Sequence, residues 1–273
     1  MIQELTNLEQ ITGGGQKEVY KADHPSHGKV VLKKIFTTGD SLERTKREIR
    51  AVKLLEDPNI PKIYWNNTED ANPNPVQLIE ERIKGDNLRE ILITGKVFGL
   101  KEVLFFLETI LTISVKLEIN NLVHRDIKPE NIMIDNTDKF WLIDFGISRH
   151  LDLESLTDTA NRFGLHTMGY ASAEQFRNNK KAIDIRSDLF SIGVVCHEML
   201  QGQNFYLENV TDPFRLMHKL SSESIPLIQI SGDPEFKLSA FIRMLGDHRR
   251  YRRPRNAKTA LSILNSIKKN LTI

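Results

Sequence analysis

One stretch of this chain, residues 189–200 with the sequence LFSIGVVCHEML, is apolar almost all the way round a helix. A helix of that kind is normally buried in the centre of a domain. With 273 residues, 40% of them apolar and 27% charged, the chain is long enough to surround such a helix. The sequence therefore predicts a helical core in the second half of the chain.

The first part of the chain has the pattern of strands. The runs at residues 18–22 and 29–35 (EVYKA and KVVLKKI) flank a turn-rich segment, which is typical of a hairpin. A further strand is predicted at residues 76–80, ahead of the sequence ERIKGDN, which we interpret as a hinge.

Two other helices are predicted from the spacing of apolar residues. The first covers residues 41–55, where Glu48, Val52 and Leu55 share one face. The second covers residues 100–119, which carry apolar residues at helical spacing. The pattern as a whole indicates a small β-rich front part and a larger helical rear part.

Charge and cysteine content narrow the class of protein. Thirty-eight Lys and Arg against 36 Asp and Glu leave a net charge of +2, which gives little attraction to nucleic acid or anionic lipid. The basic stretch at residues 248–258 (HRRYRRPRNAK) fits nucleic acid, an acidic partner or a solvated face, and we favour the solvated face. A lone cysteine, Cys196, cannot form an internal disulfide, and no apolar run approaches the ~20 residues that span a bilayer. Without a secretory signal in MIQELTNLEQ, we expect a cytoplasmic protein with no membrane span and no nucleic-acid partner.

The densest group of chemically active residues lies in the middle of the chain. The sequence HRDIKPEN runs from His124 to Asn131, and DFG begins at Asp144, thirteen residues after Asn131. The intervening residues 132–143 (IMIDNTDKFWLI) predict a β-hairpin, which would bring Asn131 and Asp144 side by side. Their oxygens are of the kind that Mg²⁺ prefers.

HRDxKxxN followed by DFG at this distance resembles the eukaryotic-type (Hanks-type) serine/threonine protein kinase family. Lys128, two residues after Asp126, indicates the serine/threonine branch, since tyrosine kinases usually carry alanine or arginine nearby. The resemblance implies an α+β, bilobal fold with an ATP cleft between the lobes. It implies a single protein kinase domain over residues 1–273, divided into an N-lobe (1–80), a hinge (81–85) and a C-lobe (86–273).

The resemblance also implies a catalytic set made of a carboxylate, two lysines and a glutamate that holds one of the lysines: Asp126, Lys128, Lys33 and Glu48. In the family, Asp126 would orient the substrate hydroxyl and Lys128 would stabilise the transferring phosphoryl group. Lys33, paired with Glu48, would grip the α- and β-phosphates. Asn131 and Asp144 would bind Mg²⁺, with Mn²⁺ as an alternative metal.

The ATP-binding residues implied by the resemblance come from a glycine-rich loop, the strand of Lys33, the hinge and one position after the catalytic loop: Thr12, Gly13, Gly14, Gly15, Gln16, Lys17, Val19, Val31, Lys33, Glu81, Ile83 and Met133. The loop departs from the family's GxGxxGxV, because Thr12 and Lys17 stand at its first and third glycines. Lys17 either adds a cation to the phosphate site or points to solvent. Glu80, just before the hinge positions, is unusual for the family.

Two structural pairings follow from the resemblance in the rear part. Glu174, at the end of the activation segment, is expected to pair with Arg253. Asp188, on the buried helix, is expected to anchor the catalytic loop. His124 is expected to be a packing residue and not a base.

Regulation is expected through the activation loop. In the family, Arg125 receives a phosphorylated residue of that loop, and Thr157 and Thr159 are the candidates here. We therefore hypothesise autophosphorylation at Thr157 or Thr159, which would add a charge of about −2 opposite Arg125. Thr167 more closely matches a residue that contacts Asp126 and Lys128.

Two other functions fit part of the sequence. A pseudokinase that senses nucleotide or acts as a scaffold would be favoured by loss of Lys33, Asp126, Asn131 or Asp144, and all four are present. A kinase for a small molecule or RNA is the second alternative, and the complete activation segment argues against it. Expected partners are protein substrates with Ser or Thr, together with a separate regulator.

Overall fold

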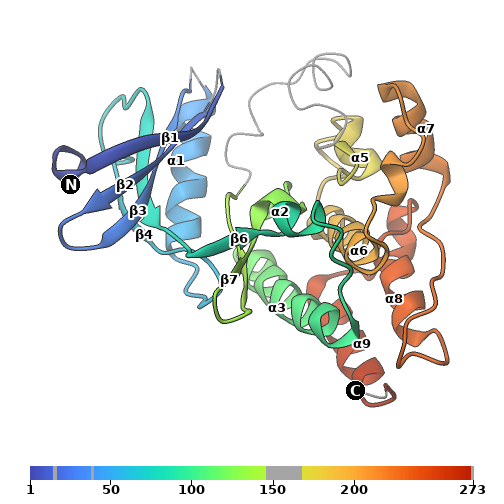
Figure 1. Cartoon of the computed structure of the whole chain (residues 1–273). Helices are drawn as coiled ribbons and strands as arrows, with labels where there is room; N and C mark the ends of the chain where they lie inside the picture. The colour runs from blue at the N-terminus through green and yellow to red at the C-terminus, as the bar shows by residue number, and fades with distance from the viewer. Residues whose placement is uncertain (15–16, 38–39, 146–167, 272–273) are drawn as a thin grey trace.

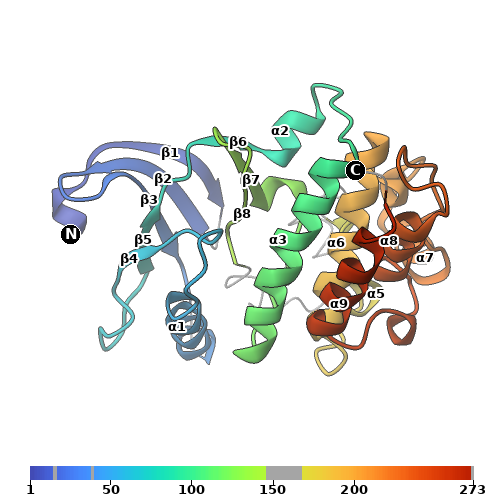
Figure 2. The ribbon, with the colours of Figure 1, turned by 90° about the horizontal axis from the view of Figure 1, so that it is seen from below.

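The amino-terminal part of the chain folds into a five-stranded antiparallel sheet in the order β1-β2-β3-β5-β4. The computed structural model describes residues 1–14, 17–37, 40–145 and 168–271. The strands of this sheet are β1 (Thr6–Gly14), β2 (Lys17–His24), β3 (Gly28–Ile35), β4 (Ile63–Asn66) and β5 (Val76–Glu81). Helix α1 (Asp40–Lys53) lies beside the sheet (Figures 1 and 2).

Strand alternation gives this sheet two different apolar faces. On one face, Ile35, Val76 and Leu78 pack against Ile49 of α1. On the other face, a separate cluster forms around Leu32 and Ile79 and the neighbouring strands. The face toward α1 is the one that also meets the rest of the molecule, because Phe145 packs against the same cluster.

A second, three-stranded sheet connects the two parts of the molecule. It consists of β6 (Gly85–Asn87), β7 (Ile132–Asp135) and β8 (Phe140–Leu142), in that order. Strands β7 and β8 form the hairpin that the sequence predicts, with Ile132 opposite Leu142. In both ribbon views this sheet lies between the five-stranded sheet and the large helices (Figures 1 and 2).

The rest of the described chain is mainly helical. Its helices are α2 (Leu88–Leu92), α3 (Leu100–Ile119), α5 (Ala173–Phe176), α6 (Ile185–Gln201), α7 (Pro213–Ser222), α8 (Lys237–Leu245) and α9 (Ala257–Lys268). The observed bounds of α3 equal those predicted from apolar spacing. This division into a β-rich and a helical lobe confirms the α+β, bilobal fold.

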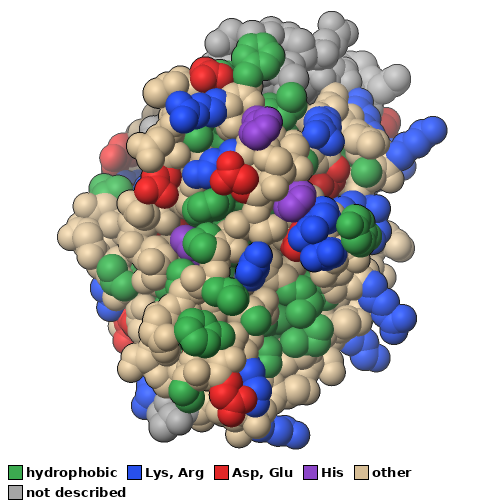
Figure 3. Space-filling view, turned by 90° about the vertical axis from the view of Figure 1, so that its right-hand side faces the viewer, with side chains coloured by type: hydrophobic (Ala, Val, Ile, Leu, Met, Phe, Trp, Pro, Cys, Tyr) green, Lys and Arg blue, Asp and Glu red, His purple; other side chains and the backbone are tan. Residues whose placement is uncertain are grey.

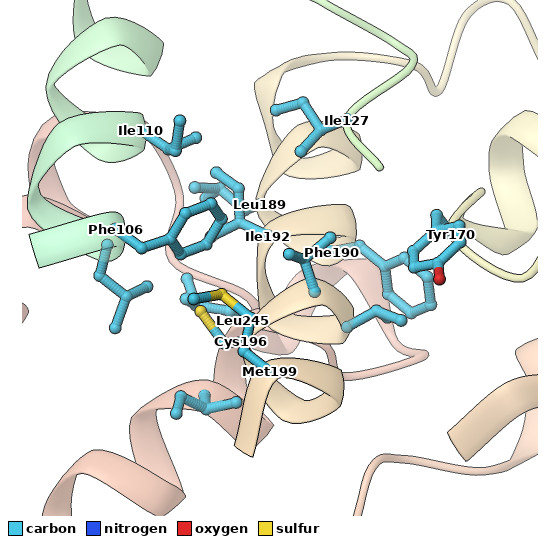
Figure 4. Close-up of a cluster of buried hydrophobic side chains, with 14 of the residues drawn as sticks. Phe106, Ile110, Ile127, Tyr170, Leu189, Phe190, Ile192, Cys196, Met199 and Leu245 are labelled. Carbon is cyan, nitrogen blue, oxygen red and sulfur yellow. The ribbon is translucent and has the colours of Figure 1, made fainter. Parts of the chain in front are cut away.

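Helix α6 lies at the centre of the helical part, as its apolar sequence predicts. Leu189, Ile192 and Cys196 are fully buried there. Figure 4 shows side chains of α3 and α8, including Phe106 and Leu245, gathered around this helix. A Cβ atom at Gly193 would lie 2.5 Å from the backbone nitrogen of Gly246, so glycine at this position lets the end of α8 approach closely.

In the described part of the chain, no helix combines the length and the apolar character that crossing a membrane requires. The longest helix there, α3, is amphipathic and packs on α6 and α9 within the helical part.

His197 on α6 should make the stability of the fold depend on pH. Within the described residues its ring nitrogens have no hydrogen-bond partner, and burial lowers the pKa of His197 from 6.5 to about 4. Because the folded-state pKa is depressed, the stabilising effect is complete above pH 6.5 and is lost as the pH falls through 4. We expect His197→Leu to remove about 3 kcal/mol of this pH dependence, measured as the free energy of unfolding from pH 7 to pH 4.

His218 provides the control for this experiment, because it is an exposed histidine on α7. His218→Leu should leave the pH profile of unfolding close to that of the parent protein. Equal profiles for His197→Leu and the parent would contradict the assignment.

Candidate active site

The loop that carries HRDIKPEN is fixed to the core by one carboxylate. Asp188, fully buried on α6, accepts hydrogen bonds from the backbone N–H groups of His124 (2.7 Å) and Arg125 (2.8 Å). Burial raises the pKa of Asp188 to about 7, although the two N–H donors favour its charged form. Arg125 has a positive φ of 65°, a costly conformation for a side chain of its size. The prediction that Asp188 anchors this loop is confirmed.

Two polar side chains of the loop contact Asp126. The Asn131 side-chain nitrogen donates to the Asp126 backbone oxygen at 2.8 Å and to its carboxylate at 2.9 Å. The Lys128 ammonium lies 3.2 Å from the same carboxylate. Asp126 is therefore held in one orientation by an amide and a cation, and the Asn131 carboxamide oxygen is left for another ligand.

The β7–β8 hairpin brings Asp144 to this loop. The backbone N–H of Ile143, next to Asp144, donates to the backbone oxygen of Asn131 at 2.9 Å. His124 supports the same junction, because its Nε2 lies 3.2 Å from the Ile143 oxygen and its ring lies 4.8 Å from that of Phe145. His124 is buried, as expected of a packing residue.

Residues on three neighbouring strands share the sheet face that carries the partners of Asp144. Val19 is opposite Lys33 in the β2–β3 ladder, and Lys33 is opposite Leu78 in the β3–β5 ladder, so their side chains share one face of the sheet. Glu80, two residues after Leu78, lies on that face as well. A pocket between the lobes is lined by Lys17, Lys33, Ile35, Leu78, Glu80, Asp144 and Phe145.

The pocket contains a compact group of opposite charges. The Lys33 Nζ atom lies 2.5 Å from Oε2 of Glu80 and 3.4 Å from Oδ1 of Asp144. Lys17 forms a further ion pair with Asp144. Burial alone would raise the pKa of Asp144, but the charges of Lys17 and Lys33 hold it well below its usual range. Burial would lower the pKa of Lys33, and Glu80 and Asp144 more than reverse this.

The predicted pair between Lys33 and Glu48 is a point of correction. Among the described residues, the ion-pair partners of Lys33 are Glu80 and Asp144. Glu48 is half-buried on α1 and engages in an interaction of its own. The physical reason is that Glu80 shares the sheet face of Lys33, whereas Glu48 reaches this face only from a separate helix. The catalytic role assigned to Glu48 remains a prediction.

The structure resolves the two interpretations of Lys17 in favour of the pocket. Its ammonium pairs with Asp144 instead of pointing to solvent. Lys17 begins β2, directly opposite Ile35 of β3, and this position directs it over the pocket.

The other predicted ATP-binding residues in the described ranges lie on the five-stranded sheet, after β5 or on β7. Thr12, Gly13 and Gly14 lie on β1, Val19 on β2, Val31 on β3, Glu81 at the end of β5, Ile83 between β5 and β6, and Met133 on β7. Gly15 and Gln16 lie outside the described residues, as do Thr157, Thr159 and Thr167. The ATP-binding role of all these residues remains a prediction.

The donor set at the junction of the lobes suits a hard divalent cation. Asp144 offers a carboxylate, and Asn131 keeps its carboxamide oxygen because its nitrogen is used by Asp126. Mg²⁺ typically takes one or two protein oxygens and completes its shell with water and phosphate. No group of three or more His, Cys, Asp or Glu side chains that could hold a metal occurs in the described ranges, so a fully protein-made metal cage is not formed there.

Arg89 of α2 contacts three other segments of the chain through its guanidinium group. These contacts were not predicted from the sequence. The Arg89 guanidinium donates to Glu130 at 3.0 Å, to Glu198 of α6 at 2.8 Å and to the hydroxyl of Tyr170. Tyr170 in turn donates to Glu198 at 2.5 Å. No local pattern in the sequence announces this group, because its members are far apart along the chain.

The pairing of Glu174 with Arg253 is confirmed. Both side chains are buried, and two guanidinium nitrogens lie 2.6 and 3.3 Å from the Glu174 carboxylate. Burial opposes ionisation, but the charge of Arg253 lowers the pKa of Glu174. Ser187, next to Asp188, also donates to Glu174 at 2.9 Å, so this pair and the loop anchor belong to one buried network.

Comparisons with known proteins agree with this geometry. Residues 5–264 match the family model described as the protein kinase domain. The probable serine/threonine-protein kinase PknB of Bifidobacterium longum is 32% identical over 244 residues, which cover 84% of this chain and 34% of that protein.

Two further relatives show the same relation. The serine/threonine-protein kinase PrkC of Bacillus subtilis is 31% identical over 201 residues, covering 72% of this chain and 30% of that protein. The serine/threonine-protein kinase PknL of Mycobacterium tuberculosis is 33% identical over 198 residues, covering 71% of this chain and 48% of that protein. In each case the aligned region spans less than half the length of the curated relative.

The ion pair between Lys17 and Asp144 predicts competition with metal. A divalent cation and the Lys17 ammonium would occupy the same carboxylate, so Lys17→Met should strengthen Mg²⁺ binding. We expect the Mg²⁺ midpoint to fall about fivefold, equivalent to about 1 kcal/mol, in a titration that follows thermal stability at constant ADP.

Lys29→Met is the matched control, because Lys29 is an exposed lysine of β3 and its loss removes the same charge. A lower midpoint in Lys29→Met as well would point to net charge in place of direct competition. An unchanged midpoint in Lys17→Met would contradict the prediction.

Proposed function

Because this chain belongs to the eukaryotic-type serine/threonine protein kinase family, we propose that it transfers the γ-phosphate of ATP to serine or threonine hydroxyls of proteins. The observation that carries the proposal is the meeting of two groups of residues at one junction. Asp126, Lys128 and Asn131 come from the helical lobe, and Lys33 comes from the sheet. Asp144 forms an ion pair with Lys33, and its neighbour Ile143 donates a backbone hydrogen bond to Asn131.

The roles of the residues follow from their charges and positions. Asp126 orients the substrate hydroxyl and accepts its proton, while Lys128, 3.2 Å away, offsets negative charge on the phosphoryl group. Lys33 holds the phosphates of ATP at the sheet face. Asn131 and Asp144 hold a divalent cation, Mg²⁺ or Mn²⁺, which would neutralise charge on the phosphates. Typical turnover for such enzymes is about 1–100 s⁻¹.

The proposal extends to the domain organisation and to the adenine site. The chain would act as one kinase domain, with the N-lobe at residues 1–80, the hinge at 81–85 and the C-lobe at 86–273. Glu81 and Ile83 would read adenine through their backbones, and Met133 would line the same site. A protein substrate, a separate regulator and a cytoplasmic setting complete the proposal.

The pseudokinase alternative has less support from the geometry. The four residues on which it depends, Lys33, Asp126, Asn131 and Asp144, are all present around the junction of the lobes. A protein that uses the fold only as a scaffold has no chemical need for these four side chains at one junction.

Nucleic-acid binding has little support as well. In the basic stretch at 248–258, Arg249 pairs with Asp247, Arg250 with Asp184, and Arg253 with Glu174. Figure 3 shows the face of the helical lobe around α7 and α8, where basic side chains are interspersed with apolar and acidic ones. This mixed surface favours the interpretation as a solvated face.

Asp126→Asn should abolish phosphate transfer. The substitution removes the proton acceptor while keeping the size of the side chain, so transfer from labelled ATP to a generic acceptor protein should fall about 100-fold or more. Phosphoamino-acid analysis of the parent reaction should find label on serine and threonine.

Asp138→Asn is the matched control, since Asp138 is an exposed aspartate at the turn of the β7–β8 hairpin. It should retain full activity. Label that persists in Asp126→Asn would reveal a contaminating kinase or a different base. Nucleotide binding without any transfer by the parent protein would shift the conclusion to the pseudokinase.

Autophosphorylation of the activation loop should depend on Thr157 and Thr159. Phosphate there would bring a charge of about −2 to the side of Arg125. We expect Thr157→Ala/Thr159→Ala protein to show the same activity as phosphatase-treated parent protein, and lower activity than untreated parent protein. Full activity of the double variant after phosphatase treatment would exclude this mode of activation.

A further inference from the structure

The acidic partner of Lys33 comes from the sheet. Lys33 and Glu80 are both buried, each with 8% of its surface exposed, and their charged atoms are 2.5 Å apart. In the described part of the chain, Lys33 is the only cation within ion-pair distance of Glu80. Single buried charges are costly, so each residue depends on the other.

The geometry of the pair is set by the sheet register. Lys33 of β3 lies opposite Leu78 of β5, which makes Glu80 its diagonal neighbour on the same face. Diagonal neighbours are within reach of long side chains. The β3–β5 ladder runs without a register shift from Val30 to Ile35, so the backbone positions of both partners are fixed by strand hydrogen bonds.

The second anion near Lys33 has a different task. Asp144 lies 3.4 Å from Lys33, is also paired with Lys17, and would bind the metal in the proposed function. Metal binding would commit much of the Asp144 charge to the cation. Glu80 is then the carboxylate that remains paired with Lys33 both before and after the metal binds.

We propose that Glu80 is the positioning residue of Lys33, holding its ammonium toward the phosphates from within the sheet. This role rests on the proposed function, because it acts through the phosphate-binding lysine. It assigns to a strand residue the task that the sequence had assigned to Glu48 of α1. Lys33 is then ordered by β5 whatever position α1 takes.

A double-mutant cycle between Lys33 and Glu80 tests the proposal. The variants are Lys33→Met, Glu80→Gln and the double variant, and the probe is Mg²⁺ with the β,γ-imido analogue of ATP. We expect Glu80→Gln to weaken binding about tenfold in the parent protein and less than about twofold in the Lys33→Met protein. Glu80→Asp, which keeps the charge, should recover part of the affinity.

Glu48→Gln in the same two backgrounds is the matched control, and its effect should add to that of Lys33→Met within about twofold. The proposal is overturned if the Glu80 cycle is additive, or if Glu48 is coupled to Lys33 and Glu80 is not. A purely structural Glu80 would lower the melting temperature equally in both backgrounds and leave affinity unchanged. If Glu80→Gln does not fold, Glu80→Met, an uncharged side chain of similar size, takes its place in the cycle.

The melting temperatures of the nucleotide-free variants give a second cycle that requires no ligand. Coupling there between Lys33 and Glu80 is expected even if the parent protein transfers no phosphate. Failure of the proposed function therefore shows as coupling without transfer. Failure of the present inference shows as transfer without coupling.

Discussion

The buried carboxylate of Asp188 is the interaction on which the rest of the site depends. It lies in the first turn of α6, the buried helix of the helical lobe, and it accepts hydrogen bonds from two backbone N–H groups of the catalytic loop. His124 and Arg125 are fixed in this way, and the positive φ of Arg125 turns the chain directly before Asp126. The hydrophobic core thus determines where the reactive carboxylate lies, although none of the core residues takes part in chemistry.

The lobes meet through charge as well as through packing. Two lysines of the sheet and two carboxylates, Glu80 and Asp144, form a group whose charges cancel. This balance explains how four ionised side chains share a partly buried pocket. Phe145 adds an apolar contact at the same junction, since it packs against clusters of both lobes. A ligand that carries phosphates and a cation would replace some of these ion pairs, with its phosphates next to the lysines and its cation next to Asp144.

Much of this arrangement could be predicted from the sequence. The contacts that were not predicted join segments that are far apart in the chain. The bounds of α3, the β7–β8 hairpin and the buried α6 follow from local periodicity, and the Glu174–Arg253 pair follows from family resemblance. The partner of Lys33 could not be predicted, because it depends on which residue of β5 faces β3. The pairing register depends on both strands together, so the pattern of either strand alone does not determine it. The Arg89 group was missed because its members are far apart in the sequence and meet only in the folded chain.

The pair of Lys33 and Glu80 links the evolution of activity to that of folding. Loss of Lys33 alone would silence the enzyme and leave a buried carboxylate without its counter-charge, so an inactive descendant would also be less stable. Loss of Glu80 alone would leave Lys33 with Asp144 as its remaining acidic partner. A lineage that gave up catalysis but kept this fold would therefore retain most stability if it replaced Lys33 and Glu80 together.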